Sequence, residues 1–207
     1  MSSAFQSRLQ STLVLALLMF GAGCAAGGAA AAGAHRSSET RLPIAGESDL
    51  QVSAFAGIPI LQKSFFWDGN GEDDTAGAKL RYLWHATDDL AIGAGLTGVG
   101  FFRGGRDGLA GEIEAVGRYF FYRGDSLGVY WDLTGGWLQA NDQVPVGGTE
   151  WNMTFSFGPG LQVPIEDRLD LITGVTYHHV SNALGRQNDR NPSQNEAQLW
   201  LGLSFRL

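Results

Sequence analysis

The side chains best suited to covalent chemistry lie close together near the C-terminus of this 207-residue chain. His179 and Ser181 are separated by one residue, so in a β-strand they project from the same face. An imidazole close to a hydroxyl can act as the base that makes serine a nucleophile. Asn182 follows at once, and its amide can donate a hydrogen bond to a developing oxyanion. The spacing predicts acyl-transfer chemistry, although a histidine and a serine near a strand end are also common as ordinary polar residues.

Alternation of apolar and polar residues predicts that this pair belongs to a larger sheet. In residues 78–86, Leu80 and Trp84 fall on one face and Lys79 falls on the other. Most segments of this kind have about 9–13 residues, the length that a tilted strand needs to cross a bilayer. Strands are predicted at residues 50–60, 78–86, 90–102, 111–122, 127–135, 151–157, 169–181 and 197–207.

Eight such strands predict a closed barrel, because every backbone polar group must be hydrogen-bonded in lipid. A barrel of this size is filled by side chains rather than open as a pore. The connections alternate between short turns and longer segments rich in Gly, Asn, Asp and Pro, as in bacterial outer-membrane barrels. The longer ones are expected near residues 61–76, 103–109, 139–149 and 183–194. Residues 49–207 are therefore predicted to form an all-β, eight-stranded antiparallel transmembrane barrel with short periplasmic turns and longer extracellular loops.

The N-terminal residues indicate export rather than a folded element. Arg8 precedes the short apolar run at residues 13–20, and small residues follow to Ala34. This pattern predicts a secretory signal peptide over residues 1–34, cleaved somewhere between positions 22 and 34. Residues 35–48 are expected to be a flexible lead-in. Lipidation at Cys24 remains an alternative, but Gly21 stands where a lipobox has a branched apolar residue.

Composition narrows the class of protein and its partners. With 14 Lys and Arg against 21 Asp and Glu, the formal charge is −7, which argues against a nucleic-acid partner. Only 17% of residues are charged, whereas a soluble domain carries about a quarter. The single cysteine excludes a disulfide framework and a thiolate zinc site. These features favour a barrel in the outer membrane of a Gram-negative bacterium.

The phase of the strand that carries the candidate pair places it toward lipid. His179 and Ser181 share a face with Leu171 and Val175, whereas His178 falls on the opposite face. Polar side chains that face lipid are costly and therefore suggest a function. A substrate that is itself a lipid would account for them.

These residues resemble a known family. The run from His179 to Ala183, followed by Asn191, Pro192 and a Glu at the start of the final strand, resembles the PagL family of lipid A 3-O-deacylases. Its members are small eight-stranded outer-membrane barrels with a C-terminal His-x-Ser-Asn motif. The rest of the chain agrees in architecture only, and Ser193 stands where the family often has Gly.

The resemblance implies a serine-hydrolase triad. Ser181 would be the nucleophile, His179 the general base, and Glu196 the acid that orients the imidazole. Asn182 would serve the oxyanion or position the substrate. The implied substrate is lipid A of lipopolysaccharide in the outer leaflet. The implied reaction is hydrolysis of the ester that holds its 3-hydroxyacyl chain at the 3-position, without a metal or cofactor.

Glu196 does not fit this assignment by phase. Ala197 and Leu199 belong to the apolar face of the final strand, which puts Glu196 on the lumen side with Gln198. A bulge at the start of that strand would be needed to turn Glu196 outward. Asp189, in the preceding connection, is the alternative acid.

Two functions from different classes remain open at this point. The first is an outer-membrane serine esterase whose active site faces the outer leaflet and whose substrate is lipid A. The second is a non-catalytic eight-stranded barrel with a structural or adhesion role. The sequence leaves open the acyl-chain preference and whether the barrel forms a homodimer.

Overall fold

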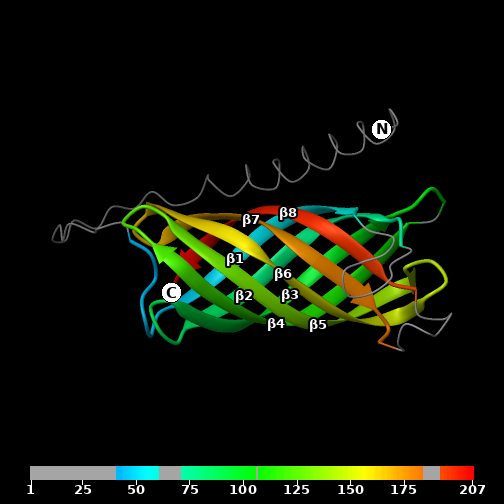
Figure 1. Cartoon of the computed structure of the whole chain (residues 1–207), viewed down its shortest axis with the longest axis horizontal. Helices are drawn as coiled ribbons and strands as arrows, with labels where there is room; N and C mark the ends of the chain where they lie inside the picture. Colours follow the sequence, from blue (N-terminus) through cyan, green and yellow to red (C-terminus); the bar gives the residue numbers. More distant parts are fainter. Residues whose placement is uncertain (1–40, 61–70, 106, 184–191) are drawn as a thin grey trace, which may run out of the picture. The chain divides into compact units, whose positions relative to one another are not determined.

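Eight antiparallel strands close on themselves in the computed structural model, which describes residues 41–60, 71–105, 107–183 and 192–207 (Figure 1). Each strand pairs with its neighbour in sequence, and the last pairs with the first. The predicted eight-stranded fold is confirmed. The strands are β1 (Ser48–Pro59), β2 (Asp74–His85), β3 (Leu90–Phe102), β4 (Gly108–Arg123), β5 (Gly128–Val144), β6 (Thr149–Glu166), β7 (Leu169–Ser181) and β8 (Gln194–Arg206). Over the described ranges, no helix is long and apolar enough to cross a membrane. The predicted signal peptide lies outside the described residues.

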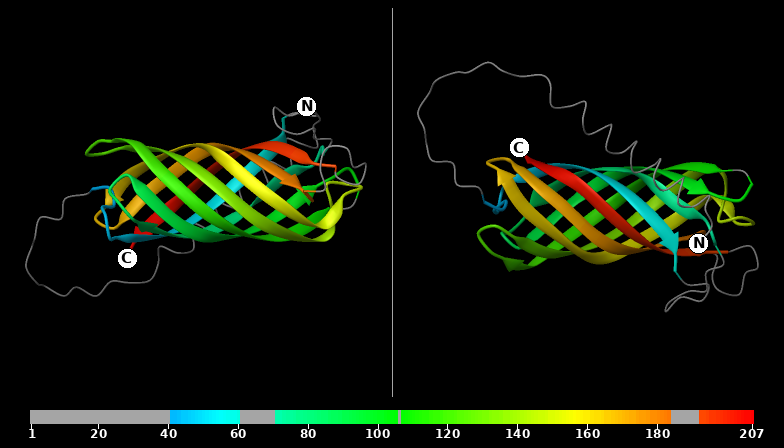
Figure 2. Two further views of the ribbon diagram at one scale, coloured as in Figure 1. Left: turned by 60° about the horizontal axis from the view of Figure 1, so that its bottom comes forward. Right: turned by 90° about the horizontal axis from the view of Figure 1, so that it is seen from above.

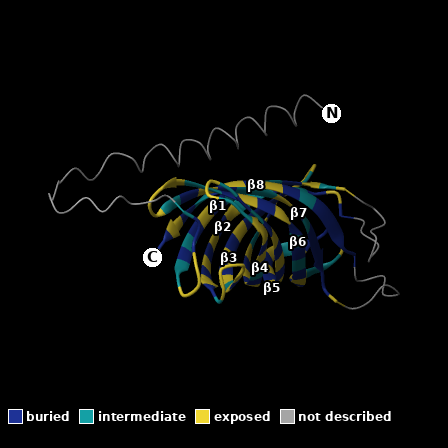
Figure 3. Cartoon of the chain, turned by 60° about the vertical axis from the view of Figure 1, so that its left-hand side comes forward, coloured by how far each residue is buried: buried dark blue, intermediate teal, exposed yellow. Residues whose placement is uncertain are grey.

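Buried and exposed residues alternate along most of each strand, as the colours of Figure 3 show, whereas the loop ends of β7 and β8 are buried on both faces. In β2, Leu80, Tyr82 and Trp84 are 43–47% exposed on the outside, whereas Lys79 and Arg81 are buried in the lumen. An apolar exterior around a polar interior is the reverse of a soluble protein and matches a barrel that is solvated by lipid. Figure 2 shows the oblique course of the strands around the barrel.

Paired charges fill the middle of the lumen. The Arg118 guanidinium donates to both carboxylate oxygens of Asp132, at 2.7 and 2.9 Å. Arg81 donates to Glu114 at 2.6 Å and reaches Asp132 at 3.2 Å. These groups are almost fully buried, and Arg118 also lies 3.6 Å from the centre of the Tyr130 ring. Buried charges are tolerated only when they are paired in this way.

Large aromatic side chains complete the filling where the facing strands carry glycine. A Cβ atom at Gly160 would lie 2.4 Å from the Tyr130 ring, and one at Gly174 would lie 2.5 Å from the Trp200 ring. Tyr130 and Trp200 stack with their ring centres 6.4 Å apart. The lumen is therefore a packed core, as expected for a barrel of eight strands.

The two ends of the barrel differ in the length of their connections. Short connections at residues 86–89, 124–127 and 167–168 define the turn end, where Asp49 pairs with Arg206 and both termini of the barrel lie. The loop end carries the connections at residues 60–73, 103–107, 145–148 and 182–193. The β5–β6 connection is shorter than predicted, because these strands continue beyond the expected ends and still pair at Val144 and Thr149.

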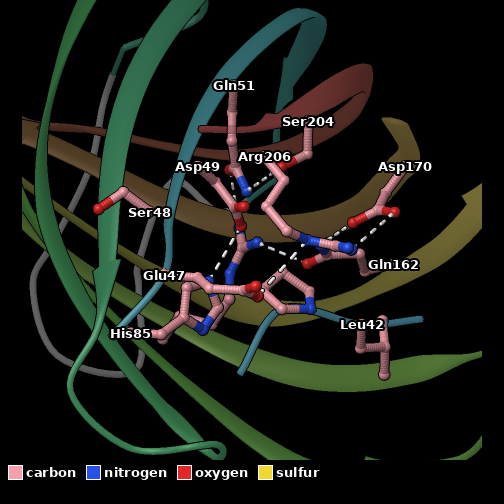
Figure 4. Close-up of polar contacts among 12 residues, drawn as sticks. Leu42, Glu47, Ser48, Asp49, Gln51, His85, Gln162, Asp170, Ser204 and Arg206 are labelled. Carbon is pink, nitrogen blue, oxygen red and sulfur yellow. Dashed lines mark hydrogen bonds and ion pairs between the residues drawn. The ribbon is translucent and has the colours of Figure 1, made fainter. Parts of the chain in front are cut away.

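Residues 41–47, called the strap below, pack across the turn end (Figure 4). Arg41 donates to the Glu47 carboxylate at 2.5 and 2.9 Å, and Leu42 is 4% exposed. Arg206 donates to the Arg41 carbonyl, and the Ala45 amide donates to Asp88 at 2.8 Å. A flexible lead-in was expected over residues 35–48, and these contacts correct that expectation for the strap. The sequence pattern missed them because a short segment without periodicity gives no sign of its partners.

Candidate active site

His179 and Ser181 are within hydrogen-bonding distance at the loop end of β7. The Nε2 atom of His179 lies 3.0 Å from the Oγ atom of Ser181. Both side chains have the outward phase of the strand, because they alternate with the lumen residues His178 and Val180. The geometry matches a serine beside its general base.

The other nitrogen of this imidazole is held by Asn195, a residue that the sequence analysis did not single out. His179 and Asn195 face each other across β7 and β8, and Nδ1 of His179 lies 2.7 Å from Oδ1 of Asn195. The hydroxyl of Tyr177 donates to the same oxygen at 2.6 Å. Because an amide oxygen only accepts hydrogen bonds, we assign the imidazole proton to Nδ1. Nε2 is then bare and faces the hydroxyl of Ser181, which is the form that a general base requires.

Apolar side chains of β6 surround the pair on the outer wall. The rings of Phe155 and His179 have their centres 4.8 Å apart, and Met153 lies directly across from Ser181. His179 is 2% exposed and Ser181 is 8% exposed. The pair therefore has the lipid-facing phase of the strand but little exposed surface.

Glu196 lies on the opposite side of the wall. It is fully buried in the lumen, where its carboxylate contacts Nδ1 of His178 at 2.5 Å and accepts hydrogen bonds from Thr75 and Gln198. The register between β7 and β8 is continuous at their loop ends, so no bulge turns Glu196 outward. The structure therefore brings Ser181 and His179 together but does not bring Glu196 to them. The alternative acid, Asp189, lies outside the described residues.

The chain turns sharply directly after the candidate nucleophile. Asn182 follows the last residue of β7 and is 1% exposed. Ala183 has a φ of 59°, the left-handed conformation that a residue with a side chain adopts only at a cost. Asn182 is therefore the last residue before the chain leaves the course of β7.

The start of β8, which carries Asn195, is held by residues of neighbouring connections. The side-chain amide of Gln194 donates to the carbonyl of Asp73 at 3.0 Å and accepts from its amide at 3.3 Å. Arg103 donates to the Asp73 carboxylate at 2.7 Å. Burial raises the pKa of Asp73, and the hydrogen bond from Arg103 opposes that rise. The Ile60 amide also donates to the carbonyl of Asn195 at 3.1 Å. These contacts fix where Asn195 meets His179.

In the described part of the chain, no group of three or more His, Cys, Asp and Glu side chains is arranged to hold a metal ion.

Known structures share this architecture. The chain resembles the outer membrane enzyme PagL with a TM-score of 0.56 and 20% identity over 73% of this chain and 97% of that one. It resembles Neisserial surface protein A with a TM-score of 0.54 and 15% identity, over 76% and 96% of the two chains. It resembles the outer membrane protein OprG from Pseudomonas aeruginosa with a TM-score of 0.51 and 12% identity, over 79% and 97%.

The fold is that of an eight-stranded outer-membrane barrel. No protein-family model matches the chain, and no curated protein matches its sequence. Identities of 12–20% establish the architecture alone, so any activity has to be argued from the residues of this chain.

Proposed function

We propose that this chain is an outer-membrane serine esterase that hydrolyses the ester-linked 3-hydroxyacyl chain at the 3-position of lipid A. The observation that carries the proposal is the 3.0 Å contact between Nε2 of His179 and Oγ of Ser181, on the outward face of a membrane barrel. The His-x-Ser-Asn motif and the likeness to the outer membrane enzyme PagL support it.

The reaction requires two acyl transfers. Oγ of Ser181 attacks the ester carbonyl carbon and gives its proton to Nε2 of His179, while the carbonyl π electrons move onto the oxygen. Asn182 donates a hydrogen bond to that oxyanion. As the carbonyl re-forms, the bond to the sugar oxygen breaks, and that oxygen takes the proton from His179. Water, activated by His179, then attacks the acyl-Ser181 ester and releases the 3-hydroxy acid.

The proposed location explains why such a pair lies on the outer wall. With the loop end at the cell surface, His179 and Ser181 lie at the level of the outer leaflet, where lipid A is. A lipid can then approach from the membrane without entering the filled lumen. Residues 41–47 and both barrel termini would lie at the periplasmic side.

Mass spectrometry of lipid A tests the activity directly. Refolded protein is incubated with lipid A beside a Ser181→Ala variant, and the fold of both is checked by circular dichroism. We expect loss of one 3-hydroxyacyl chain with the wild type, and at least a 1000-fold slower loss with the variant, because the residual rate lacks the nucleophile. Equal rates would refute Ser181 as the nucleophile.

A non-catalytic barrel with a structural or adhesion role is the second candidate. The observation that favours it is the low exposure of the pair, 2% for His179 and 8% for Ser181. Intact lipid A after incubation with a correctly folded wild-type protein would support this candidate and refute the esterase.

A further inference from the structure

We infer that Asn195, held by Tyr177, does the work that an acidic residue does in a serine-hydrolase triad. This inference rests on the proposed esterase function and concerns how its base is oriented. Asn195 and Tyr177 act through His179, so they are positioning residues rather than catalytic ones.

Two hydrogen bonds that meet on one oxygen fix the orientation of the Asn195 amide. Oδ1 accepts from Nδ1 of His179 at 2.7 Å and from the Tyr177 hydroxyl at 2.6 Å. In a flipped amide the NH2 group would face both groups instead. It would donate to Nδ1 of a His179 protonated on Nε2, and the hydrogen of the Tyr177 hydroxyl would lose its acceptor. Tyr177 is itself fixed by ring contacts with Phe155 and Phe157, whose centres lie 5.9 and 5.1 Å away. Asn195 and Tyr177 therefore hold the tautomer of His179 in which Nε2 carries no proton and can take one from Ser181.

A neutral amide suits this position better than a carboxylate does. Asn195 pairs with His179 on the outward face, and an ionised group on the lipid-facing wall of a barrel is costly. An amide supplies the orientation without that cost, as the Cys-His-Asn arrangement of papain-like proteases does. It stabilises the charged imidazolium less than a carboxylate would, so the base gives up its proton more readily.

The acidic residue next to Asn195 has a different set of partners. Glu196 lies in the lumen, where His178, Thr75 and Gln198 satisfy its carboxylate. Because the register of β7 and β8 is continuous, His179 and Asn195 form an outward pair, and His178 and Glu196 form a lumen pair beside it. Glu196 is therefore the matched control for Asn195: it is one residue away, carries the acid, and faces the other side.

The pH dependence of kcat/KM for lipid A hydrolysis distinguishes the two residues, because its acid limb reports on the free enzyme's base. Asn195→Ala should lower kcat about 100-fold through loss of orientation, and Tyr177→Phe about five-fold through loss of one hydrogen bond. Asn195→Asp should move the acid limb to higher pH, because a carboxylate favours the imidazolium. Glu196→Gln should leave the acid limb in place. An acid limb that moves with Glu196→Gln and not with Asn195→Asp would overturn the inference.

A spectroscopic measurement keeps this test independent of activity. In ¹⁵N spectra of the histidine side chains, His179 should show a proton on Nδ1 in the wild type and in Ser181→Ala, and Asn195→Leu should lose it. If lipid A stays intact but this signal is present, the esterase proposal fails and the orientation of His179 stands. A proton on Nε2 in the wild type would refute the inference directly.

Discussion

Two consecutive residues of β7 face opposite environments, and so do the two residues opposite them. His178 meets Glu196 in the lumen, while His179 meets Asn195 on the outer wall. The partner of each histidine is decided by register, because a slip of one residue exchanges the two faces of a strand. The identity of the orienting residue is therefore a property of strand pairing rather than of the order of residues in a motif.

Asp132 offers a test of how the lumen tolerates charge. It accepts hydrogen bonds from both Arg118 and Arg81, and its removal leaves two buried guanidinium groups without their shared partner. We expect Asp132→Ala to lower the free energy of unfolding by about 3–5 kcal/mol. The double variant Arg118→Met/Asp132→Leu should cost less than that, because no unpaired charge remains at the position of Arg118.

Urea unfolding of the protein in detergent micelles measures both effects. Asp125→Ala is the control, because Asp125 is an exposed acid in the turn between β4 and β5. If Asp132→Ala and Asp125→Ala had equal effects, the Asp132 pairs would contribute nothing to stability.

The sequence predicted the facing of most site residues and missed the one that holds His179. Period-two alternation put Glu196 in the lumen with Gln198, which the structure confirms. The same count places Asn195 outward, two residues before Ala197, but the strand was predicted to begin only at that alanine. The signal that could have identified Asn195 was a polar residue with outward phase directly before an apolar strand. Its partner could not be predicted, because pairing between β7 and β8 depends on register, which alternation alone does not give.

The elements were predicted best where lipid imposes a contrast between the two faces. The boundaries of β3 (Leu90–Phe102) and β7 (Leu169–Ser181) agree with the sequence pattern. β5 (Gly128–Val144) and β6 (Thr149–Glu166) are longer than expected. At the loop end, the extensions include Asn141, Asp142 and Glu150, and polar residues there do not alternate against apolar ones. At the turn end, β6 continues through Gly158, Pro159 and Gly160, residue types that are rare inside strands. Hydrogen bonding to the neighbouring strand continues the sheet where the sequence contrast has ended.

Acid should release the strap from the turn end. The hydrogen bond from Arg41 holds the pKa of Glu47 below its usual value, and the Ile44 amide also donates to this carboxylate. The folded state favours the ionised form of Glu47. The carboxylate therefore contributes fully to the stability of the strap above the ordinary glutamate pKa of about 4.3, and this contribution is lost as the pH falls through the lowered pKa. We expect the amide resonance of Ile44 to move in this acid range.

A titration followed by amide NMR measures this effect, with Glu47→Gln as the control. The neutral amide can still accept from Ile44 but does not titrate, so its Ile44 resonance should stay constant over the same range. A wild-type resonance that stays equally constant would show that Glu47 does not control the strap.

For the whole barrel, the number of strands and the contrast between a polar lumen and an apolar outer wall could be predicted from the sequence. Closure follows from the need to pair every edge in lipid. The way in which the lumen is filled could not be predicted, because Tyr130 and Trp200 occupy space that depends on glycines of other strands. The sequence does not indicate which aromatic ring packs against Gly160 or Gly174.

The placement of Trp200 gives the protein a built-in optical reference. Among the described tryptophans, Trp84, Trp131, Trp137 and Trp151 are 36–44% exposed on the outer wall, whereas Trp200 is 4% exposed behind it. In vesicles of brominated phospholipid, fluorescence of the outer four should be quenched, while that of a variant that retains only Trp200 should change little. Equal quenching of Trp200 would mean that lipid reaches the lumen. The emission of that single-tryptophan variant thus reports packing inside the barrel, while the quenching of the outer four reports its insertion.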